Sequence, residues 1–350
     1  MNILIIMDPG ISVPPKTYGG IERIVFLLAN AYHLAGHDVT LLAGPGSYCD
    51  GTTAHFGSDT PVKSKPSSCL DVGVVWQFLI KKQLLRRNMS YDLVHNFGRL
   101  IYLIPLIYHR STKIMSYQRK ITQQNILFLN RLGSTNLLFT ACSKNCISSS
   151  LSEPQSRLGI WHTIHNAIDF SSYTLRTEVD DRAPLMFLGR LDRIKGAHTA
   201  IEAAKATGSK LWIGGNIPET GDALNYYEQA IAPETNGLDI IYLGPLTDEQ
   251  KNHYLGRSKA LLFPIEWEEP FGIVMIEAMA CGTPVIAYAR GAVPEVVEHG
   301  ISGFIVNNKE DMCEAVRNIN VLNRSACRAT AMSKFDISNV AQQYLDLVKR

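Results

Sequence analysis

The sequence predicts an α/β protein made of two doubly wound, Rossmann-like domains. Its 350 residues are enough for two domains with separate cores, and strand-like segments alternate with helix-like segments in both halves. One polar run, Ser171 to Arg182, interrupts this alternation. We therefore expect an N-terminal domain at 1–170, a linker at 171–183, a C-terminal domain at 184–335 facing it, and a helix at 336–350 packing back toward the N-terminal domain.

The first half reads as a parallel sheet with helices on both faces. A glycine pair, Gly19-Gly20, opens the helix that follows the first strand, where open parallel sheets bind ligands. The expected strands are Asn2–Met7, Asp38–Ala43, Tyr91–Asn96, Lys113–Ser116, Leu137–Thr140 and His162–Asp169, and the expected helices are Gly20–Ala35 and Val72–Arg87.

The second half repeats the pattern, with glycine or proline after several strands. We expect one helix to open near Phe271–Gly272 and to end at Gly282, a glycine C-cap. The expected strands are Pro184–Leu188, Lys210–Ile213, Ile240–Leu243, Ala260–Phe263 and Val285–Tyr288, and the other expected helices are Ala197–Thr207 and Ile337–Arg350.

Composition is that of a soluble globular protein, with 46% hydrophobic and 19% charged residues. Seven cysteines without metal-ligand spacing indicate reduced thiols and a cytoplasmic protein without a secretory signal. Residues 1–165 hold 16 Lys and Arg against 8 Asp and Glu, although the whole chain carries only +2. Basic clusters at 81–87 and 110–120 suit contact with the inner face of an anionic membrane or with an acidic acceptor, and the alternative is that they are solvated helix faces. We expect no nucleic-acid partner.

The stretch from Glu266 to Gly282 places Glu269 just before a helix and Glu277 inside it. Free amides at the start of that helix attract a phosphate or a hydroxylated ring, and two carboxylates can grip an elongated ligand from both ends. These amides belong to Phe271, Gly272, Ile273 and Val274. A helix-dipole charge at Glu269 and a solvated face at Glu277 are the alternative.

Two cations, Arg190 and Lys195, flank a loop just before another helix, where a diphosphate fits; ordinary surface charge is the alternative. Glycines at strand ends permit close approach of a nucleobase, at Gly214, Gly215 and Gly244 with Leu246 beyond. No Asp-x-Asp presents a metal, and the run 44–49 lacks the third glycine of a dinucleotide fingerprint. We therefore expect neither a metal nor a cofactor, and a nicotinamide-dependent dehydrogenase is disfavoured.

Five motifs together make the chain resemble the family 4 glycosyltransferases, retaining enzymes of the GT-B fold, over nearly its whole length. They are Tyr18–Arg23, Val94–Asn96, His165–Asp169, Phe187–Gly196 and Phe263–Val285, the last containing the Glu-x7-Glu signature. The resemblance implies that Glu269 and the 271–274 backbone hold the donor sugar and that Glu277 takes the ribose hydroxyls. It also implies that Arg190 and Lys195 hold the diphosphate, with Gly19 and Gly20 closing over it.

One position departs from the family pattern. After the strand at 113–116 relatives commonly carry a histidine near the donor sugar and the acceptor, whereas this chain has Gln118. Glutamine forms hydrogen bonds but is no general base. His95, at a neighbouring strand end, is the remaining candidate, and a structural role is its alternative.

The predicted function is transfer of a hexosyl group, with retention, from a nucleotide-diphosphate sugar to an acceptor hydroxyl. UDP-glucose-like donors are the first expectation because they are frequent in this family. The expected acceptor is a carbohydrate, a lipid or a small molecule, in the glycosylation of cell-surface polysaccharides, lipids or natural products. Candidate catalytic residues are Glu269, Arg190, Lys195, His95 and Gln118. A catalytically silent nucleotide-sugar-binding protein and other GT-B enzymes, such as an epimerase or a phosphorylase, are the alternatives. The oligomeric state stays open.

Overall fold

The computed structural model describes residues 1–16, 19–59, 65–84, 90–151 and 159–348. The chain divides into two compact units. The first comprises Met1–Asn166 with Ile337–Arg350, and the second comprises Ala167–Asp336. The run 171–183, predicted as a linker, clusters with the second unit. Each unit is described below on its own.

The first unit contains a seven-stranded sheet in the order β3-β2-β1-β4-β5-β6-β7, and every strand pair in it is parallel. All five predicted strands up to residue 141 are present, and β3 is an additional edge strand. The last predicted strand is shorter and earlier, at β7. The strands are β1 (Asn2–Ile6), β2 (Asp38–Ala43), β3 (Thr52–His55), β4 (Leu93–Asn96), β5 (Thr112–Tyr117), β6 (Leu137–Ala141) and β7 (Ile160–Thr163).

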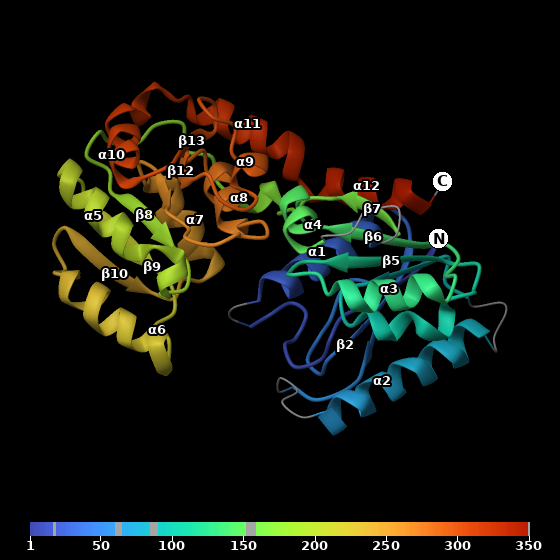
Figure 1. Cartoon of the computed structure of the whole chain (residues 1–350). Coiled ribbons are helices and arrows are strands. Elements are labelled where there is room, and N and C mark those ends of the chain that lie inside the picture. Colours follow the sequence, from blue (N-terminus) through green and yellow to red (C-terminus); the bar gives the residue numbers. More distant parts are fainter. Residues whose placement is uncertain (17–18, 60–64, 85–89, 152–158, 349–350) are drawn as a thin grey trace. The chain divides into compact units, whose positions relative to one another are not determined.

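Helices cover both faces of this sheet: α1 and α12 run along one side, and α2 and α3 along the other (Figure 1). Helix α1 buries an apolar stripe with helical spacing that includes Ile24, Leu28 and Tyr32. The predicted helix from Val72 instead begins seven residues earlier, and its predicted end at 85–87 lies outside the described residues. The helices are α1 (Gly20–Leu34), α2 (Lys65–Leu79) continued by η1 (Ile80–Leu84), η3 (Leu100–Leu106), α3 (Gln123–Arg131), α4 (Lys144–Ser150) and α12 (Ile337–Val348).

The second unit contains a six-stranded sheet in the order β10-β9-β8-β11-β12-β13, again with parallel pairs. The edge strand β13 is the one that the sequence did not predict. The strands are β8 (Leu185–Leu188), β9 (Leu211–Gly214), β10 (Ile240–Gly244), β11 (Leu261–Phe263), β12 (Val285–Tyr288) and β13 (Gly303–Val306). The helices are α5 (Ala197–Thr207), α6 (Gly221–Tyr226), α7 (Asp248–Arg257), α8 (Ile273–Ala280), α9 (Val293–Val296), α10 (Lys309–Asn318) and α11 (Arg324–Phe335), with short turns η5 (Phe170–Ser172), η6 (Arg193–Lys195), η7 (Tyr227–Ile231), η8 (Ala232–Glu234) and η9 (Ile319–Val321).

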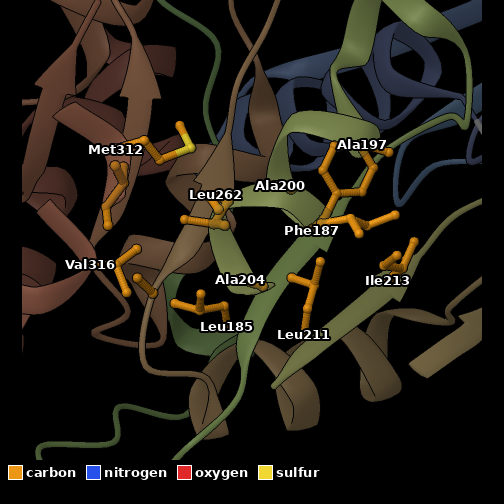
Figure 2. Close-up of a cluster of buried hydrophobic side chains, with 14 of the residues drawn as sticks. Leu185, Phe187, Ala197, Ala200, Ala204, Leu211, Ile213, Leu262, Met312 and Val316 are labelled. Carbon is orange, nitrogen blue, oxygen red and sulfur yellow. The ribbon is translucent and has the colours of Figure 1, made fainter. Parts of the chain in front are cut away.

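One face of this second sheet packs against α5 and α10, and Figure 2 shows the core between them. Alternate strand residues such as Leu185 and Phe187 point to this face, as the two-residue strand period requires. Helix α5 meets the sheet with alanines, including Ala200 and Ala204, so the helix lies close against the strands. Helix α5 begins directly after the loop that carries Arg190 and Lys195, so its packing against the sheet also fixes where that loop ends.

Two arginines of α11, the buried Arg324 and the half-buried Arg328, hold the run that follows residue 169 onto the second unit. Arg328 donates to the carbonyls of Phe170 at 2.7 Å and Tyr173 at 2.8 Å. Arg324 donates to the Arg176 carbonyl at 2.7 Å and makes further hydrogen bonds within the unit. Burial lowers the pKa of Arg324 to about 10. Because each of these carbonyls is satisfied by a fixed cation, the run is an integral part of the second unit.

Candidate functional site

The loop after β8 is pressed against the loop after β11. Gly196 adopts φ +75°, and a Cβ there would lie 2.1 Å from the Pro264 carbonyl oxygen, so only glycine fits. Beside it, the Glu266 amide donates to the Ile194 carbonyl at 2.8 Å. These contacts bring Lys195 to the stretch that carries Glu269.

Lys195 and Glu269 form an ion pair of 2.5 Å between Nζ and Oε2, with side chains only 13% and 12% exposed. The Trp267 indole donates to the same oxygen at 2.8 Å, and Lys195 Nζ lies 5.2 Å from the centre of the indole ring. Two groups that the sequence assigned to diphosphate and sugar are therefore neighbours. The sequence analysis did not identify Trp267 as a site residue, although it lies inside the Phe263–Val285 motif, two residues before Glu269.

The backbone of Glu269 is held by a second tight turn. Gly291 has φ +58°, and a Cβ there would lie 2.3 Å from the Glu269 nitrogen. The Ala292 amide donates to the Glu269 carbonyl at 2.9 Å, and Glu268 accepts from the Gly291 amide at 3.1 Å. This support fixes where the Glu269 carboxylate stands before any ligand arrives.

Helix α8 opens as the sequence predicted, with Gly272 as its N-cap in the left-handed conformation, φ +83°. A Cβ on Gly272 would lie 2.8 Å from the Met275 methyl group and 3.2 Å from the Phe263 ring. The amides in the first turn of α8 have no intrahelical acceptor, so they form the positive end of the helix dipole. Glu269 lies three residues before this end.

Glu277 lies on α8 but is not on a solvated face, because only 3% of the residue is exposed. Its Oε1 accepts from Lys251 at 2.5 Å and from the Tyr173 hydroxyl at 3.1 Å. Lys251 also pairs with Asp248 at 2.9 Å. Burial opposes the charge of Lys251, but these two carboxylates outweigh it and raise the pKa of Lys251. Lys251 and Tyr173 were missed because no local pattern links them to α8.

Arg190 lies on the same loop as Lys195, but its ion pair is with Asp192, at 3.0 Å, and its side chain is 49% exposed. The other carboxylate oxygen of Asp192 is buried and has no hydrogen-bond partner among the described residues. The structure therefore holds the two predicted diphosphate ligands differently: Lys195 is locked to Glu269, whereas half of Arg190 faces solvent.

The strand-end glycines meet one another. The Gly189 amide donates to the Gly214 carbonyl at 3.0 Å, and the Gly215 amide donates to the Gly244 carbonyl at 2.9 Å. A Cβ on Gly215 would lie 1.8 Å from the Gly189 carbonyl oxygen, and one on Gly214 would lie 2.9 Å from Leu246. Side-chain packing thus explains Gly214 and close backbone packing explains Gly215, whereas among the described residues nothing lies within 4 Å of a Cβ on Gly244.

In the first unit, His95 is completely buried at the end of β4. Its ring nitrogens lie 2.7 Å from the Ser116 hydroxyl and 3.2 Å from the Tyr32 hydroxyl, and its ring packs 4.5 Å from that of Tyr344. Burial lowers the pKa of His95 to about 3, so the ring is neutral near pH 7. This geometry supports the structural alternative for His95, and we do not retain it as a catalytic candidate.

Gln118 directly follows β5 and lines a cavity within the first unit. Gly19, the N-cap of α1, is packed so that a Cβ would lie 2.6 Å from Pro15 and 2.8 Å from the Glu22 carboxylate. Glu22 is 7% exposed, and burial raises the pKa of its carboxyl group. The predicted pair Gly19 and Gly20 therefore stands beside a buried carboxyl group.

Two searches of the described ranges bear on metals and membranes. Among these residues, no group of three or more His, Cys, Asp or Glu side chains could hold a metal ion. None of the helices in the same part of the chain is both long enough and apolar enough to cross a bilayer.

Residues 176–334 match the family model described as "Glycosyl transferases group 1". A Klebsiella pneumoniae protein named "Uncharacterized 41.2 kDa protein in cps region" is 29% identical over 175 residues, 48% of this chain and 47% of that protein. Alpha-maltose-1-phosphate synthase of Mycobacterium tuberculosis is 25% identical over 381 residues, 96% of this chain and 97% of that protein. The match thus spans about half of the first relative and nearly all of the second.

A solved structure of Anabaena HepE in complex with UDP-glucose superposes with a TM-score of 0.72 at 19% identity, covering 100% of this chain and 99% of that one. At this identity the likeness shows the fold, and with the two parallel sheets it confirms the predicted GT-B class. The family model thus matches a stretch that lies within the second unit.

Proposed function

We propose that this chain, taken as a glycosyltransferase with the GT-B fold, moves a hexosyl group from a nucleotide-diphosphate sugar to an acceptor hydroxyl and retains the anomeric configuration. We assign it to family 4 through its Glu-x7-Glu stretch. The observation that carries the proposal is the Lys195–Glu269 pair, in which Glu269 lies three residues before Gly272, the N-cap of α8, while Glu277 lies buried within the same helix.

On the donor side, Glu269 accepts hydrogen bonds from sugar hydroxyls, and the amides at 271–274 face the same ring. Glu277 takes the ribose hydroxyls, for which its second oxygen, Oε2, is the available acceptor because Oε1 already accepts from Lys251 and Tyr173. Both assignments rest on the same chemistry, because an ionised carboxylate accepts several hydrogen bonds at once and can therefore bind adjacent hydroxyl groups.

The diphosphate lies between these two carboxylates, against Arg190, Lys195 and the α8 N-terminus. Lys195 can hold Glu269 and a phosphate oxygen together, because its ammonium group has three N–H donors. Arg190, half exposed, turns from Asp192 to the diphosphate. As the glycosidic bond breaks, negative charge grows on the leaving diphosphate, and these fixed cations and dipoles stabilise it without a metal ion.

The acceptor proton goes to the leaving phosphate, so the reaction requires no protein base. This agrees with the absence of a titrating group at Gln118 and with the neutral, interior His95. UDP-glucose is the first donor to test, since Anabaena HepE was solved with it and the fold is shared.

A catalytically silent nucleotide-sugar-binding protein is the second candidate, and Gln118 in place of the usual histidine favours it. The two candidates share a donor site and differ only in turnover. Release of UDP from UDP-glucose, by transfer or by slow hydrolysis, excludes the silent protein.

The experiment is a thermal-shift screen of UDP, GDP and ADP and their sugars in EDTA. At a hundredfold excess over the dissociation constant, binding adds about 2.7 kcal/mol of stability. Glu277→Gln keeps the shape of the side chain and should weaken the shift, whereas Glu314→Ala, an exposed change on α10, should not. No shift with any nucleotide, or a shift only with added metal, contradicts the proposed donor site.

A further inference from the structure

The first unit contains a cavity of about 420 Å³ at the carboxyl edge of three adjacent strands, β1, β4 and β5. Asp8, Phe97 and Gln118 line it just beyond these strand ends, while η3 and α3 form its other wall. Its volume falls within the ~300–1,000 Å³ of small-molecule sites, and the carboxyl edge of a parallel sheet is where such sites occur.

The two ends of this cavity differ in chemistry. Asp8, Ser116 and Gln118 bring polar groups to the strand ends, whereas the lining residues of η3 and α3 are apolar except for Asn125. The apolar lining includes Ile101 and Phe128, residues that are 42% and 56% exposed despite their size. An amphiphilic ligand fits this division, with a polar head at the sheet and an apolar group along the two helices.

Gln118 lies at the polar end with an unsatisfied amide. Both its oxygen and its nitrogen are buried, and neither has a hydrogen-bond partner among the described residues. A buried polar group without a partner destabilises the folded state, so a ligand that pairs with both atoms of this amide would be stabilised by it. By contrast, the nearby carboxylate of Asp8 is satisfied, because it accepts from Tyr102 at 2.8 Å and pairs with Arg99 at 3.3 Å.

The chemistry of an amide selects among ligands. It presents a donor and an acceptor side by side, and two adjacent hydroxyl groups complement both, because each hydroxyl can donate and accept. A phosphate bearing only acceptor oxygens would satisfy the amide nitrogen and leave the oxygen unpaired. Arg99, Arg119 and Lys120 also line the cavity, and two of them face a carboxylate, because Asp8 lies 3.3 Å from Arg99 and 3.9 Å from Arg119.

We infer that this cavity binds the acceptor of the transfer reaction, and that the acceptor is a neutral sugar or polyol with adjacent hydroxyls and an apolar substituent. Gln118 is then a specificity residue that reads the hydroxyl pair, while Phe128 and Ile101 contact the apolar group. The role as acceptor rests on the proposed function, but binding at the cavity can be measured without the donor.

The test measures binding of octyl glycosides to the full chain by titration calorimetry, below their micelle-forming concentrations. The panel is octyl β-D-glucoside, octyl β-D-galactoside and octyl α-D-mannoside, with methyl β-D-glucoside and octyl phosphate as comparisons. We expect at least one octyl glycoside to bind about tenfold more tightly than either comparison. Octyl phosphate binding as tightly as every glycoside, or no glycoside binding, overturns the inference.

Variants separate recognition from folding. Gln118→Met should weaken binding of the preferred octyl glycoside about tenfold and raise the melting temperature by about 2–4 °C, because it removes the unpaired amide. Gln124→Met, a matched change at an exposed position of α3 outside the cavity lining, should do neither. Phe128→Ala should weaken the octyl glycoside but not the methyl glycoside. A lower melting temperature for Gln118→Met would make Gln118 a structural residue and refute its role.

The outcome is independent of the donor site. If UDP binds but no octyl glycoside does, the acceptor inference fails and the proposed function stands. If an octyl glycoside binds through Gln118 but no nucleotide binds, the cavity is confirmed as a polyol site and the proposed function fails.

Discussion

The ion pair between Lys251 and Glu277 provides a quantitative test of the second unit. In Lys251→Met the aliphatic stem is kept, but the Glu277 carboxylate loses its cation and keeps the Tyr173 hydroxyl. Removing one partner of a buried ion pair costs about 3–5 kcal/mol. Since the Lys251 side chain is 13% exposed and that of Glu277 is 5% exposed, we expect a loss near the lower end, about 3 kcal/mol.

The measurement is urea unfolding followed by fluorescence, in a background where Trp76 and Trp161 are phenylalanine. Trp212 and Trp267, both in the second unit, then remain, and Trp212 reports on the region because its ring packs 5.0 Å from that of Tyr254 on α7, the helix that carries Lys251. Lys334→Met is the matched control. Its ion pair with Glu298 is 2.8 Å long but exposed, so its loss should cost at most about 1 kcal/mol.

The pH dependence follows from the sign of the shift. Because the pKa of Lys251 is raised in the folded protein, its stabilising contribution is complete below the ordinary value of 10.5 and is lost as pH rises through the folded pKa. The difference between wild type and Lys251→Met should therefore stay constant from pH 6 to 9. A difference below about 1 kcal/mol, or one no larger than that of Lys334→Met, would refute the assignment of a buried structural pair.

Three further predictions concern the loops and the core. Gly196→Ala should destabilise the second unit by about 1–3 kcal/mol more than Gly221→Ala, because both glycines have φ +75° but only a Cβ at Gly196 would lie against a carbonyl. Equal losses of stability in urea unfolding would contradict this. Lys195→Met should reduce UDP-glucose turnover at least about a hundredfold while the melting temperature of the apoprotein shows whether the fold persists; unchanged turnover would remove Lys195 from the mechanism. Wild type should lose stability as pH falls from about 6.5 toward 3, by up to about 1.4 kcal/mol per pH unit, because the pKa of His95 is lowered to about 3 in the folded state. His95→Gln should lack this loss, and parallel pH profiles of the two proteins would argue against a neutral buried ring.

Much of the fold could be predicted because its signals are local. The helix expected at Ala197–Thr207 has those bounds in the structure, and the strand Asp38–Ala43 is equally well placed. The prediction failed at the sheet edges and at the start of α2, and it did not include several helices, among them α3, α7, α10 and α11. Strand β3, Thr52–His55, is half exposed and has no buried apolar run, and the two central residues of β13, Gly303–Val306, are only half buried. Edge strands are defined by pairing with a neighbour, which a single segment does not display.

The sequence by itself determined which groups make up the proposed donor site, because Glu269, the α8 start and Glu277 lie within one short stretch whose spacing is a local property. Only the tertiary structure decided what each group contacts. Lys195 meets Glu269 across 74 positions, Lys251 meets Glu277 across 26, and Tyr173 meets it across 104. Likewise, the sequence marked Gln118 as a departure, but its unpaired amide emerged only when β5, η3 and α3 enclosed it. Burial and pairing depend on which segments pack together, and the sheet order sets this.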